Sequence, residues 1–229
     1  MMYANNDVIG IGNAIVDILS TVSEAFLKEF NLDKGNMTLI SAETAEELFQ
    51  TLSQDQSNRI WTYISEGPFK KLSNFKKYLQ KKDIFFYAIY SKKTRTFCGL
   101  ASYLRVKRDV GVIEVGYITY APCLQQTVAA TESMFLMMQN VFENLGYRRY
   151  EWKCDNLNLK SKRAAVRLGF TFEGVFRQAN IYKKRNRDTA WFSIIDLDWK
   201  NIKKKYQKYL QASNFDKNLK QKKRLKLFN

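Results

Sequence analysis

The sequence predicts a mixed α/β fold in which helices pack on a sheet, and three observations support this. Helical and strand-like segments alternate along residues 41–197. Gly146 and Gly169 each follow a helical pattern, at the position where glycine commonly ends a helix. Hydrophobic residues make up 45% of the 229-residue chain, which is enough to fill the core of one sizeable domain.

The expected helices rest on capping residues and apolar spacing. Ser41 begins the first, and the third repeats apolar residues every three to four positions before Gly146. The expected helices are 41–52, 71–82, 129–145 and 161–168. The expected strands are 84–90, 95–104, 110–120, 149–154, 170–177 and 189–197, with a basic loop at 183–188 before the last.

The composition excludes several kinds of site. The chain has no histidine, which rules out histidine bases, histidine triads and histidine zinc ligands. Its 3 cysteines form no CxxC pair, so we expect no metal site and a reducing compartment. A basic leader and an apolar run long enough to span a bilayer are both missing, which predicts a cytoplasmic protein without membrane contact.

The positive charge is concentrated at the C-terminus. The net charge is +16, and residues 200–229 hold eleven Lys and Arg residues with Asp216 as their one acid. Tyr206, Tyr209 and Phe215 interleave with these bases, a pattern found in proteins that bind single-stranded nucleic acid. The spacing of the two tyrosines also fits the buried face of a helix, and both interpretations stay open.

Two short segments have the composition of ligand-binding turns. Residues 125–130 open a helix with small side chains, whose backbone N–H groups suit a pyrophosphate, although many helices begin this way. Asn158 and Ser161 lie where a strand passes into a helix. They either cap that helix or hydrogen-bond an amide-containing ligand.

Residues 113–199 resemble the GNAT acetyltransferases, and in particular the branch of ribosomal-protein N-terminal acetyltransferases. The resemblance rests on the segments IEVGYITY, LQQTVAATESM, LGYRRYEWKC, NLKSKRAAVRLGF, EGVFRQ and RNRDTAWFSI. Weaker similarity extends back to about residue 41 through WTYISEGPF.

The resemblance implies a mixed, V-splayed sheet flanked by helices, with acetyl-CoA between the strands 110–120 and 149–154. The backbone of Tyr117, Ile118 and Thr119 would pair with the pantetheine arm and polarise the thioester carbonyl. Asn158 would contact the pantetheine, and Ser161 would lie near the sulfur. The loop that would hold the pyrophosphate consists of Gln125, Gln126, Thr127, Val128, Ala129 and Ala130.

The sequence departs from the family pattern at two positions. Val128 occupies the first glycine position of the pyrophosphate loop, where a branched side chain restricts the backbone. Ala165 stands where many members have a tyrosine that protonates the thiolate, so Ser161 or a water is expected to take that role.

The implied reaction is direct attack of a primary amine on acetyl-CoA, and the amine must be neutral to attack. The sequence does not name the acceptor: small molecules such as amines and antibiotics, protein N-termini and lysine side chains all stay open. Glu114 is the best candidate for the base that removes the proton, or it pairs with a neighbouring basic side chain. Four charged residues either shape the acceptor side or form a solvated hairpin, namely Arg177, Arg185, Arg187 and Asp188.

Residues 6–40 resemble the start of an adenosine-kinase-type sugar kinase, without the rest of such an enzyme. Within them, 8–11 reads as a strand and 23–30 as a short helix, and 37–40 is expected to form the first strand of the acetyltransferase sheet. The expected organisation is therefore a kinase-like remnant at 1–36, an acetyltransferase domain at 37–199 and a basic tail at 200–229. The alternative function is nucleic-acid or ribosome binding on a degenerate GNAT scaffold.

Overall fold

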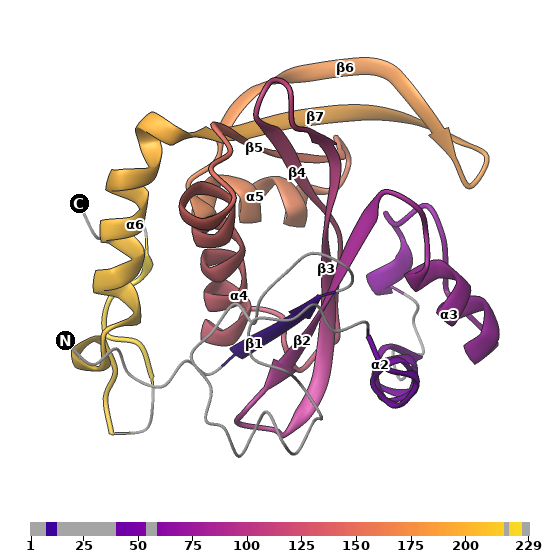
Figure 1. Ribbon diagram of the computed structural model, residues 1–229, viewed down its shortest axis with the longest axis horizontal. Helices are drawn as coiled ribbons and strands as arrows, with labels where there is room; N and C mark the ends of the chain where they lie inside the picture. The colour runs from indigo at the N-terminus through magenta and orange to yellow at the C-terminus, as the bar shows by residue number, and fades with distance from the viewer. Residues whose placement is uncertain (1–7, 13–39, 54–58, 218–219, 226–229) are drawn as a thin grey trace. The chain divides into compact units, whose positions relative to one another are not determined.

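A computed structural model describes residues 40–53, 59–217 and 220–225, and the backbone of residues 8–12 (Figure 1). These residues fall into two compact units. The first, here called the N-terminal unit, lies within 7–106 and 114–133. The second, called the C-terminal unit, comprises 107–113 and 134–229. The expected helix at 23–30 and the expected strand at 37–40 lie outside the described residues, apart from Ile40.

The N-terminal unit is built on strands in the order β1-β2-β3-β4. β1 (Val8–Gly12) pairs antiparallel with β2 (Ile84–Ser91), and β2 pairs antiparallel with β3 (Thr96–Lys107). β4 (Val112–Tyr120) belongs to this unit apart from its first two residues. One neighbour of β2 thus comes from residues 6–40, whose resemblance to a sugar kinase stays a prediction.

Besides the start of α4 (Val128–Gln139), the described residues of this unit form two helices and one short turn. They are α2 (Ala42–Ser53), the 3-10 turn η1 (Arg59–Trp61) and α3 (Leu72–Leu79). Ser41 caps α2 as expected, because its Oγ accepts a hydrogen bond from the Thr44 amide at 3.1 Å. The core is aromatic: the rings of Trp61 and Tyr78 lie 6.2 Å apart, and those of Tyr78 and Phe86 lie 4.8 Å apart.

Besides the start of β4, the described residues of the C-terminal unit form three antiparallel strands in the order β5-β7-β6. They are β5 (Arg149–Asp155), β6 (Thr171–Tyr182) and β7 (Arg185–Ile195). The helix α4 (Val128–Gln139) begins in the N-terminal unit and ends in this one, where the π-helical turn η2 (Asn140–Asn144) follows it. The helix expected at 129–145 therefore changes its hydrogen bonding in the last turn, where the Leu145 amide bonds to Asn140 O.

The prediction of a basic loop at 183–188 is wrong. β6 and β7 continue to a two-residue turn, Lys183–Lys184, where both residues have positive φ, at 46° and 59°. That geometry matches the twist of the flanking strands, so the hairpin extends to its tip. Asp188 stabilises an irregular point in the hairpin by accepting a hydrogen bond from the Gln178 amide at 2.8 Å. This bond lowers the pKa of Asp188.

The strand expected to reach 197 ends at Ile195, and the basic segment that follows is largely helical. α6 (Asp196–Leu210) runs alongside α4 (Figure 1), and η3 (Ala212–Asn214) follows it. Tyr206 is 1% exposed and its ring stacks on Phe135 at 5.0 Å. Trp199 stacks on Phe142 at 5.2 Å. Tyr206 and Tyr209 therefore form part of the core, and the buried-face interpretation holds for both, whereas Phe215 is half-buried.

Gly169 ends α5 (Leu159–Leu168) in the left-handed conformation, with φ +104°. Its amide donates to Val166 O at 3.1 Å, and the Phe170 amide donates to Ala165 O at 3.0 Å, which is the Schellman arrangement. A Cβ at Gly169 would also lie 3.3 Å from Cδ1 of Ile202 in α6. The helix end and the packing of α6 thus both favour glycine.

Gly169→Ala should lower the free energy of unfolding by about 1–2 kcal/mol, because alanine is strained in the left-handed region. Urea unfolding followed by circular dichroism measures the loss. Gly146→Ala is the matched control, since Gly146 also has positive φ (+67°) but a Cβ there meets no atom within 4 Å. The loss should be smaller in the control, and an unchanged Gly169→Ala variant would contradict the assignment.

Candidate active site

The middle of β4 departs from regular strand geometry where the thioester contact is expected. Tyr117 has a φ of +50°, which is uncommon for a residue other than glycine. The hydroxyl of Ser102 donates to Gly116 O at 3.0 Å, and that of Thr119 donates to Tyr117 O at 3.1 Å. Side-chain hydroxyls thus satisfy these two carbonyl groups and hold the irregular backbone in place.

The Tyr117 ring fixes the same segment from the other side. It packs edge-on against Tyr78, with ring centroids 5.8 Å apart, and against Phe86 at 5.6 Å. Lys81 lies 5.5 Å from the ring centroid and forms an ion pair with Glu66. The expected pantetheine segment therefore rests on the aromatic core of the N-terminal unit.

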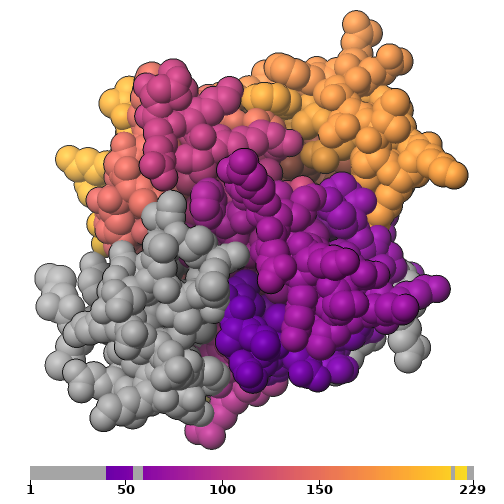
Figure 2. Space-filling model, turned by 45° about the vertical axis from the view of Figure 1, so that its right-hand side comes forward, coloured from indigo at the N-terminus to yellow at the C-terminus, as the bar shows by residue number. Residues whose placement is uncertain are grey.

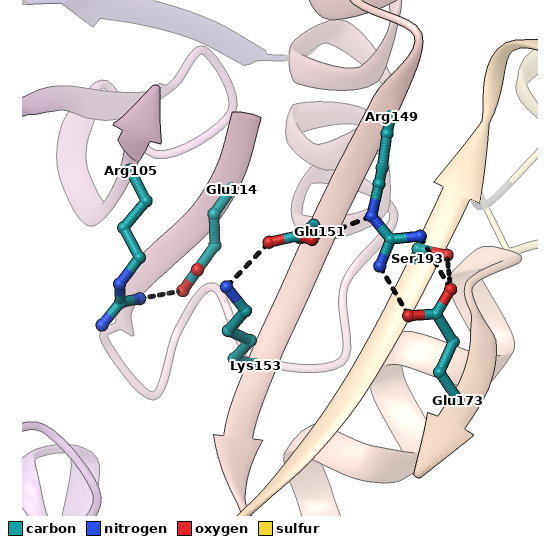
Figure 3. Close-up of polar contacts among 7 residues, drawn as sticks. All are labelled: Arg105, Glu114, Arg149, Glu151, Lys153, Glu173 and Ser193. Atoms are coloured by element: carbon teal, nitrogen blue, oxygen red, sulfur yellow. Dashed lines mark hydrogen bonds and ion pairs between the residues drawn. The ribbon is translucent and has the colours of Figure 1, made fainter. Parts of the chain in front are cut away.

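Glu114 is buried and forms an ion pair. Its side chain is 3% exposed, and its Oε1 accepts a hydrogen bond from Nη1 of Arg105 at 2.6 Å (Figure 3). Arg105 is 55% exposed, so the carboxylate has a partner that reaches solvent. The ion pair that the sequence left open is thus present, and the role of Glu114 as base remains a prediction.

The N-terminus of α4 is organised around Thr127. Its Oγ1 accepts a hydrogen bond from the Ala130 amide at 3.1 Å, which is an N-cap, and donates to Leu124 O at 2.6 Å. Gln125 Nε2 donates to Tyr120 O at 2.9 Å and ties the loop back to β4. In the part of the chain that the structure describes, the amides of Gln126, Val128 and Ala129 donate to no protein group.

Val128 causes no backbone strain. It is the first residue of α4, and the residue with positive φ in this loop is Gln126, at 62°. The conformational reason for a glycine therefore does not apply at Val128, and its half-buried side chain is the feature that distinguishes this loop.

Asn158 and Ser161 lie in the C-terminal unit, and both side chains form hydrogen bonds within the fold. Asn158 caps α5, because its Oδ1 accepts a hydrogen bond from the Ser161 amide at 3.1 Å. The Ser161 hydroxyl accepts a hydrogen bond from the Trp152 indole at 2.9 Å, which leaves its own proton available to donate. Burial raises the pKa of the nearby Cys154 thiol, and a hydrogen bond with Ser161 partly opposes that rise. Ala165, at the family's tyrosine position, is fully buried.

The predicted site residues are therefore divided between the two units. Glu114, residues 117–119 and residues 125–130 lie in the N-terminal unit, and Asn158 and Ser161 lie in the other. Within the described residues, no cluster of three or more acidic or cysteine side chains could hold a metal ion. No described helix has the length and apolar composition needed to cross a membrane.

The β6–β7 hairpin brings two of the four charged candidates together. The Arg185 and Arg187 guanidinium groups lie over the Tyr182 ring, with centroid distances of 4.9 and 5.7 Å. The Tyr182 hydroxyl donates to Asp155 at 2.7 Å. Burial is the larger cause and the Asp155 carboxylate the second cause that raise the pKa of Tyr182 to about 12. Figure 2 shows the hairpin residues, coloured orange, at the surface of the molecule. Arg177 is exposed and lies close enough to Asp188 to help lower the pKa of that carboxyl.

An ion-pair network across β5, β6 and β7 was not anticipated. Arg149 binds Glu151 at 2.8 Å and Glu173 at 2.5 Å, and Lys153 binds Glu151 at 2.7 Å (Figure 3). Lys153 also lies 3.8 Å from the Trp191 ring centroid. The alternation of charged residues at 149, 151 and 153 is the signal that could have revealed it, since every second residue of a strand shares a face.

Comparison with known proteins identifies the family. The model of the acetyltransferase (GNAT) domain matches residues 36–171. A GCN5-related N-acetyltransferase from Brucella melitensis is 42% identical, with 82% of this chain and 88% of that chain covered and a TM-score of 0.79. The chain belongs to the GNAT acetyltransferase family. It is an N-acetyltransferase, and enzymes of this family use acetyl-CoA.

Other solved GNAT structures are similar over most of their length. A probable acetyltransferase from Chromobacterium violaceum is 37% identical, with 70% of this chain and 82% of that chain covered and a TM-score of 0.65. The microcin C7 self-immunity acetyltransferase MccE was solved with acetyl-CoA and AMP. It is 22% identical, with 68% of this chain and 88% of that chain covered and a TM-score of 0.60, and this likeness shows the shared fold. A search of curated proteins finds no match. The ribosomal-protein branch and the kinase-like front segment stay predictions.

Proposed function

We propose that this GNAT enzyme transfers the acetyl group of acetyl-CoA directly to a primary amine, on a small molecule or a protein N-terminus. Acetyl-CoA supplies an acetyl group activated as a thioester. The observation that carries the proposal is the N-terminus of α4, where Thr127 fixes the first turn and the amides of Gln126, Val128 and Ala129 have no acceptor among the described residues.

These residues fit the pyrophosphate of acetyl-CoA. Amide donors at the positive end of a helix stabilise phosphate charge, and Ala129 adds little bulk beside them. The Ala130 amide is already bonded to Thr127, so its neighbours supply the donors. The strained backbone at Tyr117, followed by Ile118 and Thr119, is proposed to hydrogen-bond the pantetheine arm and the thioester carbonyl.

Glu114 is proposed as the base that accepts the proton of the attacking amine, directly or through a water. Burial excludes competing solvent from most of its side chain, and Arg105 fixes the orientation of its carboxylate. Asn158 is proposed to contact the pantetheine. Ser161 is proposed to donate its proton to the departing sulfur, since its oxygen already accepts the Trp152 N–H.

The test uses Ala129, because the buried Ala130 (8% exposed) offers no room for a longer side chain. Ala129→Glu places a negative charge at the phosphate position, whereas Ala129→Gln adds nearly the same bulk without charge. Acetyl-CoA affinity measured by calorimetry should fall about tenfold or more for Glu relative to Gln, with a larger difference at low salt.

The fold provides an independent control for this test. A glutamate in the first turn of a helix is favourable, so Ala129→Glu should unfold no earlier than Ala129→Gln. Equal acetyl-CoA affinities in the two folded variants would exclude the N-terminus of α4 as the pyrophosphate site.

The alternative function, nucleic-acid or ribosome binding, loses the support of two of its aromatic residues. Tyr206 and Tyr209 are 1% and 3% exposed, so neither ring is available to stack on bases. The exposed lysines of α6 remain, and a charge run of this kind is ordinarily a solvated helix face.

A further inference from the structure

A groove of about 780 Å³ lies within the C-terminal unit between α5, α6 and the start of β6. Its floor is apolar and buried: Leu168, Phe192 and Tyr206 are each 2% exposed or less. None of the residues proposed to bind acetyl-CoA lines it. The groove is therefore a separate feature of the molecule, which acetyl transfer leaves unexplained.

The walls of the groove expose large apolar side chains. Leu159 and Val166 of α5 are 57% and 59% exposed, and Phe172 of β6 is 51% exposed. Single exposed apolar residues are ordinary, but three of them around one buried apolar floor form a continuous surface suited to an apolar ligand.

The rim of the groove is positively charged. Lys162, Arg163 and Arg167 of α5 and Lys205 of α6 all line it, and no acidic residue of the described chain does. Lys162 donates to Asn156 at 2.7 Å. Within the described ranges, Arg163 and Lys205 form no ion pair. An occupant that carries negative charge would therefore be favoured at the rim.

We propose that this groove binds a free single-chain anionic amphiphile, a fatty acid of about ten carbons. The chain would lie against Leu159, Val166 and Phe172, and the carboxylate would be held by Arg163 and Lys205. The volume lies in the range of small-molecule sites, roughly 300–1,000 Å³. Stable docking of a folded protein needs about 800 Å² on each partner, far more than this surface provides.

Calorimetric titration of the full chain with decanoate below its micellar concentration tests the apolar part of the proposal. Decanoate should bind about tenfold more tightly than octanoate, because each additional buried methylene raises the affinity several-fold. Decyltrimethylammonium, with the same chain and the opposite charge, should bind at least about tenfold more weakly than decanoate. Equal affinities for decanoate and octanoate would reduce the groove to an anion site and overturn the proposal.

Two charge reversals on α5 test the location. Arg163→Glu should weaken decanoate binding about tenfold. Lys160→Glu makes the same change in net charge on the same helix at an exposed position that does not line the groove, and it should leave the affinity within about twofold. Circular dichroism confirms the fold of both. Equal losses in the two variants, or binding to anionic vesicles without binding to monomeric decanoate, would each overturn the proposal.

Discussion

Glu114→Gln should lower the turnover number about 10²–10⁴-fold, the usual contribution of a general base. Glutamine keeps the size of the side chain and an acceptor for Arg105, but it cannot accept the proton. Acetyl-CoA affinity should stay unchanged. Steady-state kinetics with an amine acceptor from pH 7 to pH 10 measures the loss. Raising the pH should restore part of the rate, because more of an acceptor amine with a pKa near ~8–10 is then neutral.

Arg105→Met distinguishes catalysis by Glu114 from its structural ion pair. It removes the guanidinium and retains the apolar stem, leaving the carboxylate in place. If Glu114 is the base, Arg105→Met should affect turnover far less than Glu114→Gln. If the two variants lose turnover equally and unfold at equally reduced urea concentrations, loss of the ion pair explains both effects and Glu114 has no role as base.

Tyr206→Ala should lower the free energy of unfolding by about 3–5 kcal/mol, the usual cost of deleting a buried aromatic ring. The ring stacks on Phe135, and the hydroxyl donates to Leu168 O at 2.9 Å. The substitution therefore leaves a cavity beside α4 and a buried carbonyl without this donor. Urea unfolding measures the loss.

Leu197→Ala is the matched control, because Leu197 is a large apolar residue of the same helix that is 81% exposed. It should change the free energy of unfolding by less than about 0.5 kcal/mol. A small effect of Tyr206→Ala would mean that α6 is a peripheral tail, as its charge suggests, and that residues 37–199 form the domain without it.

The order of elements and several of their ends follow from local chemistry. Ser41 caps α2, and Gly169 ends α5, because these side chains, or the lack of one, satisfy neighbouring backbone groups. The strand ends predicted at 177 and 189 are wrong for a different reason. The pairing of β6 with β7 extends the hairpin to the Lys183–Lys184 turn, and such long-range pairing overrides the polar composition of the segment.

The candidate site could be located from the sequence only in part. Small residues after β4 indicated a phosphate-binding turn, and Thr127 was within it, but its capping bonds appear only in the folded chain. The positive φ of Tyr117 had no signal in the sequence, because tyrosine rarely adopts it and the aromatic core of the N-terminal unit holds it there.

The sequence by itself determined the alternation of helices and strands, the absence of histidine chemistry and the motifs that resemble the GNAT family. Each depends on residue type or on spacing along a few turns of chain. The tertiary structure decided that Glu114 pairs with Arg105, that Tyr206 is buried and that α5 and α6 enclose an apolar groove. These features join residues far apart in the chain, and a side chain's partner and exposure depend on what the fold packs against it rather than on its neighbours in sequence.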